Sequence, residues 1–355
     1  MNSNPSQLVD PTLHGPIPVR SDWLALREEP VIDPELPIID AHHHLWTRSY
    51  APYMFDDLLA DVQSGHKVAA TIFVQCSTMY RSDGPENMKP LGEVEFANGV
   101  AAMSASGAYG QARLCAGIVG FADLLQGRSV RPLLEAQMKA AGERFKGIRT
   151  LAAWSPVQVK AVPDTDSRQQ LLSDKTYREG LAELVDLGLS LDVLIFHTQI
   201  DEIDDLARAF PSARIVVNHM ASPVISGPYR ERADEMRQLW REGIKRLSDR
   251  PNVYLKLGGI ASRLSGSMMH TLPEPPSSER LAAHFQPFVT HCVDYFGAER
   301  CMFESNFPVD KGQTSYRLLW NAFKLASARY NRHQREALFW RTANDFYRLD
   351  IKPGT

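Results

Sequence analysis

Cysteine and long apolar runs are what this sequence has least of. Its 355 residues include four cysteines, which are widely spaced and form no CxxC pair. That excludes a dense disulfide framework and a cysteine-ligated zinc site, so we expect reduced thiols in the core. No stretch reaches the roughly 18 apolar residues of a membrane span, and the N-terminus lacks the basic and then apolar pattern of a secretory signal. These absences predict a cytoplasmic protein.

An excess of charge of one sign is also lacking. The chain carries 39 Lys and Arg against 42 Asp and Glu, a net charge of -3. Such a balance provides no strong field for nucleic-acid phosphates or for an anionic membrane. We therefore expect a small-molecule substrate as the partner, with neither nucleic acid nor membrane. Whether the chain forms a homo-oligomer stays open.

Several catalytic signatures are absent as well. The sequence contains no GxSxG elbow, no Walker loop and no HExxH motif. Their absence argues against α/β-hydrolase, P-loop and zincin chemistry.

What the sequence does contain is enough apolar material for a large globular unit, with 44% hydrophobic and 9% aromatic residues. The first 37 residues hold seven of the 23 prolines and show no apolar period. That composition is typical of an irregular arm lying over a domain. We expect residues 1–37 to form a proline-rich arm and residues 38–355 to form a single domain.

Eight short runs of β-branched and apolar residues, each of strand length, recur after residue 37. Amphipathic segments such as 199–210 lie between them, and helical segments near 314–329 and 333–347 follow the last run. This alternation predicts an α/β fold, a (β/α)8 TIM barrel with closing C-terminal helices. A doubly wound sheet is disfavoured because histidines, rather than a GxGxxG turn, follow the first run. The runs begin at residues 37, 68, 113, 145, 189, 213, 252 and 300.

Two long connections, residues 78–91 and 258–280, follow the second and seventh predicted strands. In a TIM barrel the loops after the strands form the active-site face. Arg81, Arg263 and His270 are the side chains in these loops that are candidates for substrate contact.

The first predicted strand ends in Asp-Ala-His-His-His, residues 40–44. Alternation along a strand predicts that Asp40, His42 and His44 point to one side and His43 to the other. Two imidazoles at the end of a barrel strand can bind a divalent cation at about 2.1 Å. The alternative is a chance histidine run at a surface turn.

Two further histidines, His197 and His219, stand where the fifth and sixth strands should end. Each alone is more often a satisfied core or surface histidine than a ligand. At the same face of the barrel as His42 and His44, they form a candidate constellation.

The last predicted strand places Met302, Glu304 and Asn306 on one face. Hydrolysis at this face needs a base to take a proton from the attacking water. Asn306 has no basic lone pair, although its carbonyl oxygen can position a water or ligate a metal. Glu304 is the nearest carboxylate that can serve as the base, and its alternative role is to pair with a lysine or arginine inside the barrel.

Two cations complete the candidate site. Arg149 ends the fourth strand, where its guanidinium suits a substrate carboxylate. Its alternative is an ion pair with Asp40 or Asp192. Lys256 is expected inside the barrel, as a substrate-binding group or as a structural charge partner.

Taken in order and spacing, five segments resemble the amidohydrolase-related (amidohydrolase 2) family, with most similarity to the sugar-lactone and 2-pyrone-4,6-dicarboxylate lactonases. The resemblance covers about residues 37–350 and implies a TIM barrel that hydrolyses a small ester-like bond, commonly a lactone. The segments are DAHHHLW at 40–46, FKGIR at 145–149, VVNHMASP at 216–223, NVYLKLGG at 252–259 and SNFPVDK at 305–311.

By position, the resemblance implies His42, His44 and His219 as metal ligands, with zinc the expected ion, and Arg149 as the fourth-strand arginine. Asn306 departs from the family, which usually has an aspartate there that activates water, so metal-free catalysis also stays open. We predict a hydrolase of a small carboxylated lactone or ester. The catalytic groups would be His219, Asn306 and Glu304, and the substrate-binding groups Arg149, His197, Lys256 and Arg263. The alternatives are a metal-dependent decarboxylase of an aromatic acid and a non-catalytic ligand-binding barrel.

Overall fold

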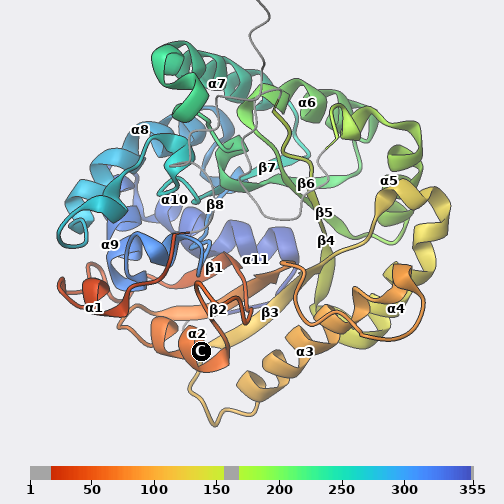
Figure 1. The fold of residues 1–355 in the computed structure, drawn as a ribbon, viewed down its shortest axis with the longest axis horizontal. Helices are drawn as coiled ribbons and strands as arrows, with labels where there is room; N and C mark the ends of the chain where they lie inside the picture. Colours follow the sequence, from red (N-terminus) through yellow and green to blue (C-terminus); the bar gives the residue numbers. More distant parts are fainter. Residues whose placement is uncertain (1–16, 156–167, 353–355) are drawn as a thin grey trace, which may run out of the picture.

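A computed structural model describes residues 17–155 and 168–352 of the chain and contains one eight-stranded parallel sheet. Neighbouring strands follow the sequence order from β1 to β8, and Figure 1 shows the helices surrounding them. All eight predicted strands are present, and the TIM-barrel prediction is confirmed. The strands are β1 Ile38–His43, β2 Val68–Val74, β3 Arg113–Gly120, β4 Phe145–Leu151, β5 Ser190–Leu194, β6 Arg214–Val217, β7 Val253–Leu257 and β8 Cys301–Phe303.

The barrel closes where β8 meets β1. A parallel bridge joins His43 to Phe307, and the His44 N–H donates to the Phe307 carbonyl over 2.7 Å. The Asn306 N–H donates to the His42 carbonyl over 2.9 Å. These bonds bring the polar ends of the first and last strands together, although about 260 residues separate them in the chain.

A helix follows every strand, as the alternation predicts. The buried face of α6 carries Ile200, Ile203 and Leu206, and Phe210 of the predicted segment lies just beyond the helix end. Among the described residues no helix is both long and apolar enough to cross a membrane. The helices are α1 Ser21–Leu24, α2 Phe55–Val62, α3 Leu91–Ala105, α4 Arg131–Ala141, α5 Lys175–Asp186, α6 Ile200–Ala209, α7 Ala233–Leu247, α8 Ser278–Phe296, α9 Tyr316–Ala326, α10 Arg332–Glu336 and α11 Thr342–Tyr347.

The barrel interior is a packed apolar core. Inward-facing strand residues such as Ile72, Val119 and Met302 form one cluster with Phe346 and Tyr347 of α11. The C-terminal helix therefore closes the end of the barrel where the strands begin, and the opposite end, where they finish, is left for polar chemistry.

The N-terminal arm, described from residue 17, packs on the long connection between β7 and α8. The Trp23 indole donates to the Leu272 carbonyl over 3.0 Å, and the Glu29 carboxylate accepts the Ser278 N–H over 3.1 Å. The arm thus holds a loop of the active-site face. Residues 1–16 of the predicted arm lie outside the described part.

Candidate active site

The end of β1 does not follow simple alternation. The pairing of β1 with β2 is irregular between Asp40 and His43. The Asp40 carboxylate accepts the Ser305 N–H over 2.8 Å and the hydroxyl of Tyr316, in the outer helix α9, over 3.1 Å. The prediction that Asp40 shares a side with His42 is therefore wrong, because the irregularity shifts the alternation by one residue.

His42 and His44 do lie together, as their spacing predicts. Their Nε2 atoms are 3.2 Å apart and their rings are nearly perpendicular. His43 points elsewhere, and its ring contacts the Thr71 hydroxyl at 2.8 Å. The strand end therefore presents two imidazole nitrogens to one point.

Glu304 lies beneath these histidines and is completely buried. Its Oε1 accepts the His219 backbone N–H over 3.1 Å and lies 2.6 Å from His219 Nδ1. Its Oε2 lies 2.8 Å from His42 Nδ1. Instead of a lysine or arginine, the carboxylate thus engages two histidines from two other strand ends.

These contacts fix where each imidazole carries its proton. A lone pair on Nδ1 would repel the Glu304 oxygens, so Nδ1 is the protonated atom in His42 and His219. His44 Nδ1 lies 2.8 Å from the Val74 carbonyl oxygen, which can only accept. In its neutral form, each of the three rings therefore keeps its lone pair on Nε2. Burial lowers the pKa of His42 and His44 well below the usual value, which favours these neutral forms.

This arrangement fits a divalent cation. Two unprotonated Nε2 atoms at 3.2 Å repel each other unless an electrophile lies between them. Two nitrogens bound to one zinc at about 2.1 Å lie roughly 3.0–3.5 Å apart. Ligand atoms of His42, His219 and Glu304 also lie within 4.8 Å of one another. The backing of a histidine by a carboxylate is the usual support of metal-binding imidazoles.

Arg149, at the end of β4, is buried against the same histidines. Its Nε donates to Gln75 Oε1 over 3.1 Å, and a second guanidinium nitrogen donates to the Gln75 carbonyl. The remaining nitrogen lies 3.4 Å from His42 Nε2. Gln75 therefore holds the arginine, with one end of the guanidinium turned toward the histidines. Gln75 was not among the predicted site residues, and its place directly after β2 is its only signal in the sequence.

His219 sits on a tight left-handed turn. Residues 219–222 all have positive φ values, between 37° and 60°. Gly259, with φ of 67°, packs against the imidazole so closely that a Cβ there would lie 2.5 Å from the His219 ring. Gly259, the last residue of the NVYLKLGG segment, must therefore be a glycine both because a side chain has no space there and because of its backbone conformation.

We expect Gly259→Ala to destabilise the protein more than Gly84→Ala. Both glycines have positive φ, so both variants carry a backbone cost of about 1 kcal/mol, but a Cβ at Gly84 meets no atom within 4 Å. The clash with His219 should add about 1–3 kcal/mol to the loss in free energy of unfolding, measured by urea titration. Equal losses for the two variants would contradict the close packing.

Lys256 lies inside the barrel in an ion pair. Its Nζ is 2.6 Å from Asp192 Oδ2, and both side chains are fully buried. The Asp192 carboxylate also accepts the Tyr347 hydroxyl over 2.9 Å and the Asn218 amide over 3.2 Å. The lysine therefore has a charge partner of the kind given above as the alternative to substrate binding, and among the described residues no ion pair joins Arg149 to Asp192.

His197 and Arg263 were predicted to bind substrate, and the structure places both at the ends of strands or in the loops that follow. His197 Nδ1 accepts the Val224 N–H over 3.2 Å, so its proton is on Nε2. That tautomer suits a hydrogen-bond donor better than a metal ligand, and burial lowers the His197 pKa to about 4. Arg263, in the loop after β7, is half-buried beside His270. In the other long loop, Arg81 is exposed and pairs with Glu95.

Asn306 follows β8 with a left-handed φ of 55°. Its amide Nδ2 donates to Asp310 Oδ1 over 3.1 Å, and both side chains are buried. Asp310 was not among the predicted site residues, although SNFPVDK contains this carboxyl group four residues after Asn306.

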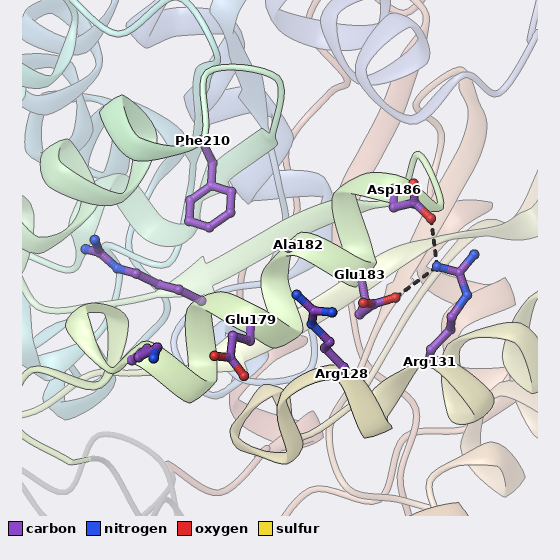
Figure 2. A pocket seen from close by; sticks show the side chains of 9 residues that line it. Arg128, Arg131, Glu179, Ala182, Glu183, Asp186 and Phe210 are labelled. Carbon is purple, nitrogen blue, oxygen red and sulfur yellow. Dashed lines mark hydrogen bonds and ion pairs between the residues drawn. The ribbon is translucent and has the colours of Figure 1, made fainter.

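A separate hollow of about 640 Å³ lies on the outer layer of helices (Figure 2). Arg131 in this hollow pairs with Glu183 at 2.9 Å and with Asp186 at 2.7 Å, as the dashed lines show. The hollow is lined by four basic and three acidic side chains together with Ala182 and Phe210, and none of the histidines lines it. The candidate chemistry is therefore at the barrel mouth.

The sequence and the fold can be compared with those of known proteins. The sequence profile of the amidohydrolase family matches residues 39–349. An uncharacterized protein of Sinorhizobium fredii is 31% identical over 337 residues, which are 89% of this chain and 99% of that protein. The L-fucono-1,5-lactonase of Burkholderia ambifaria is 22% identical, over 89% of this chain and 97% of its own. A crystal structure of an amidohydrolase from Burkholderia multivorans with bound zinc superposes with a TM-score of 0.65 at 22% identity, covering 88% of this chain and 99% of that chain.

Proposed function

The chain belongs to the amidohydrolase family, and from this membership and the site geometry we propose that it hydrolyses a small, carboxylated lactone. The observation that carries the proposal is the Glu304 carboxylate 2.6 Å from His219 Nδ1. A carboxylate that holds the Nδ1–H of a histidine leaves Nε2 as a base. His219 is also the most exposed of the three site histidines, so its Nε2 is the one most open to a substrate.

In this proposal each residue has one task. His219 Nε2 takes the proton of the attacking water and returns it to the leaving alkoxide oxygen. Glu304 holds the His219 and His42 tautomers. Arg149 attracts the substrate carboxylate, since its charge is buried and one end of its guanidinium is turned toward the histidines. Asn306 orients the water through its amide oxygen.

His42 and His44, whose Nε2 atoms are 3.2 Å apart, are the residues that would hold a divalent cation, for which zinc is the expected ion. His219, the third predicted ligand, keeps its Nε2 lone pair for the base in this proposal. When bound, such an ion polarises a carbonyl group and lowers the pKa of a water toward about 7. The lactonase and zinc-bound relatives support this proposal, because their chains match this one over nearly its whole length.

The proposal is tested with the purified wild-type protein. We expect about one equivalent of divalent metal by mass spectrometry and hydrolysis within a panel of sugar and dicarboxylate lactones. Removing the metal with a chelator should lower the rate of lactone hydrolysis at least tenfold, and adding zinc should restore the rate. A carboxylated lactone should exceed its methyl ester in kcat/KM by about 10- to 100-fold, the value of one charge-assisted contact with Arg149.

Each part of the proposal can fail separately. Full turnover by the protein after chelation would contradict the dependence of hydrolysis on a metal ion. Equal rates for the acid and its methyl ester would contradict the role of Arg149. Release of carbon dioxide from an aromatic acid, without hydrolysis of any lactone, would identify a decarboxylase instead.

A further inference from the structure

Asp310 is a buried carboxyl group without a cationic partner among the described residues. Only 1% of its surface is exposed, and its carboxyl accepts a hydrogen bond from the Asn306 amide over 3.1 Å. The adjacent Lys311 turns away and pairs with Asp61 at 2.6 Å. Burying a carboxyl group that no cation compensates costs stability, so a functional reason for its position is expected.

The backbone fixes both ends of this contact. The left-handed conformation of Asn306 is held by its N–H bond to the His42 carbonyl. Asp310 begins a short 3₁₀ turn, in which its N–H donates to the Asn306 carbonyl over 3.2 Å and its carbonyl accepts from the Gln313 N–H over 2.9 Å. The two side chains are therefore held against each other beside the histidine that begins the site.

We propose that Asp310 is a positioning residue, which binds the Asn306 amide nitrogen and so turns the Asn306 amide oxygen toward the attacking water. An asparagine side chain has a donor end and an acceptor end, and nothing in its own shape selects between them. With Nδ2 engaged by Asp310, the acceptor Oδ1 is directed away from that carboxyl. This inference rests on the lactone hydrolysis proposed above.

The choice of end matters for the reaction. An attacking water must donate one proton to a base, and it is oriented by donating the other to an acceptor oxygen. An amide turned the other way would present N–H groups to the water and hold it in the wrong orientation. Burial, and then the nearby Glu304 charge, raise the pKa of Asp310 to about 8. Whether or not it carries a proton, the carboxyl has an oxygen that can accept from the Asn306 amide.

The test compares two substitutions of one residue. Asp310→Leu keeps the number and branching of the side-chain heavy atoms but removes the acceptor. We expect kcat to fall about 10²-fold with little change in KM, as expected for a misoriented nucleophile. Asp310→Asn restores an acceptor oxygen and should recover most of that loss. In an Asn306→Ala background, Asp310→Leu should cause no further loss.

Three kinetic results would overturn the proposal: full kcat in Asp310→Leu, no recovery in Asp310→Asn, or an equal loss in the Asn306→Ala background. The last of these would show that Asp310 acts without Asn306. Comparing the thermal unfolding temperature of each variant with that of the wild type shows whether a fall in kcat comes from loss of folded protein.

A second readout does not depend on activity. Hydrogen exchange of the Asn306 carboxamide can be followed by NMR in protein labelled with ¹⁵N-asparagine, with the signal assigned by its absence in Asn306→Asp. We expect slow exchange in the wild type and in Asp310→Asn, and exchange at least tenfold faster in Asp310→Leu. Equal exchange in all three would also overturn the proposal. If the wild type hydrolyses no lactone but the exchange pattern holds, the proposed function fails while the Asp310–Asn306 contact stands.

Discussion

Replacing His219 by asparagine is expected to lower kcat for lactone hydrolysis by about 10²- to 10⁴-fold, the usual contribution of a general base. The asparagine amide can still donate to Glu304, as His219 Nδ1 does over 2.6 Å, so the support beneath the site is kept. What is lost is the Nε2 lone pair. Steady-state kinetics should therefore show a fall in kcat with a smaller change in KM.

His333→Asn is the matched control for this variant. His333 is an exposed histidine on α10, and its replacement should leave kcat unchanged. If His219→Asn kept more than a tenth of wild-type kcat, His219 would not be the base, and the role of Glu304 as its support would fall with it.

Replacing Lys256 by methionine is expected to lower the free energy of unfolding by about 3–5 kcal/mol. The side chain is fully buried, and its Nζ lies 2.6 Å from the Asp192 carboxylate. Methionine fills a similar volume but leaves Asp192 as a charge inside the barrel, where the Tyr347 hydroxyl and the Asn218 amide still donate to it. Urea denaturation followed by fluorescence and circular dichroism measures the loss.

Two further variants separate the charge from the packing. Adding Asp192→Asn to Lys256→Met removes the uncompensated charge and should recover a large part of the stability. Lys139→Met, at an exposed position of α4, should change stability by less than about 0.5 kcal/mol. A loss in Lys256→Met no larger than that of Lys139→Met would contradict the buried ion pair.

The fold was predictable because the strands of a parallel barrel are buried on both faces. Runs such as VAATIFV in β2 are therefore apolar throughout and bounded by polar segments, and this pattern is visible without any tertiary contact. The same reasoning placed His42, His44, His219 and Glu304 near the ends of strands, where a barrel collects its chemistry.

The alternation rule failed at Asp40. One irregular pairing between β1 and β2 turns that carboxylate toward the outer helix α9, while His42 and His44 stay together. Such an irregularity depends on how the neighbouring strand pairs, so a single strand read by itself does not reveal it.

The sequence by itself thus determined the barrel, the order of its strands and the residue types at its mouth, because local apolar periodicity encodes all three. Tertiary structure alone decided the partners: Glu304 with His219 and His42, Arg149 with Gln75, and Lys256 with Asp192. These pairs join residues 64 to 262 positions apart, and the most distant are Glu304 and His42, whose strands meet only when the barrel closes. Which side chains meet depends on strand register and on the curvature of the sheet, and neither property is written in the residues of one segment.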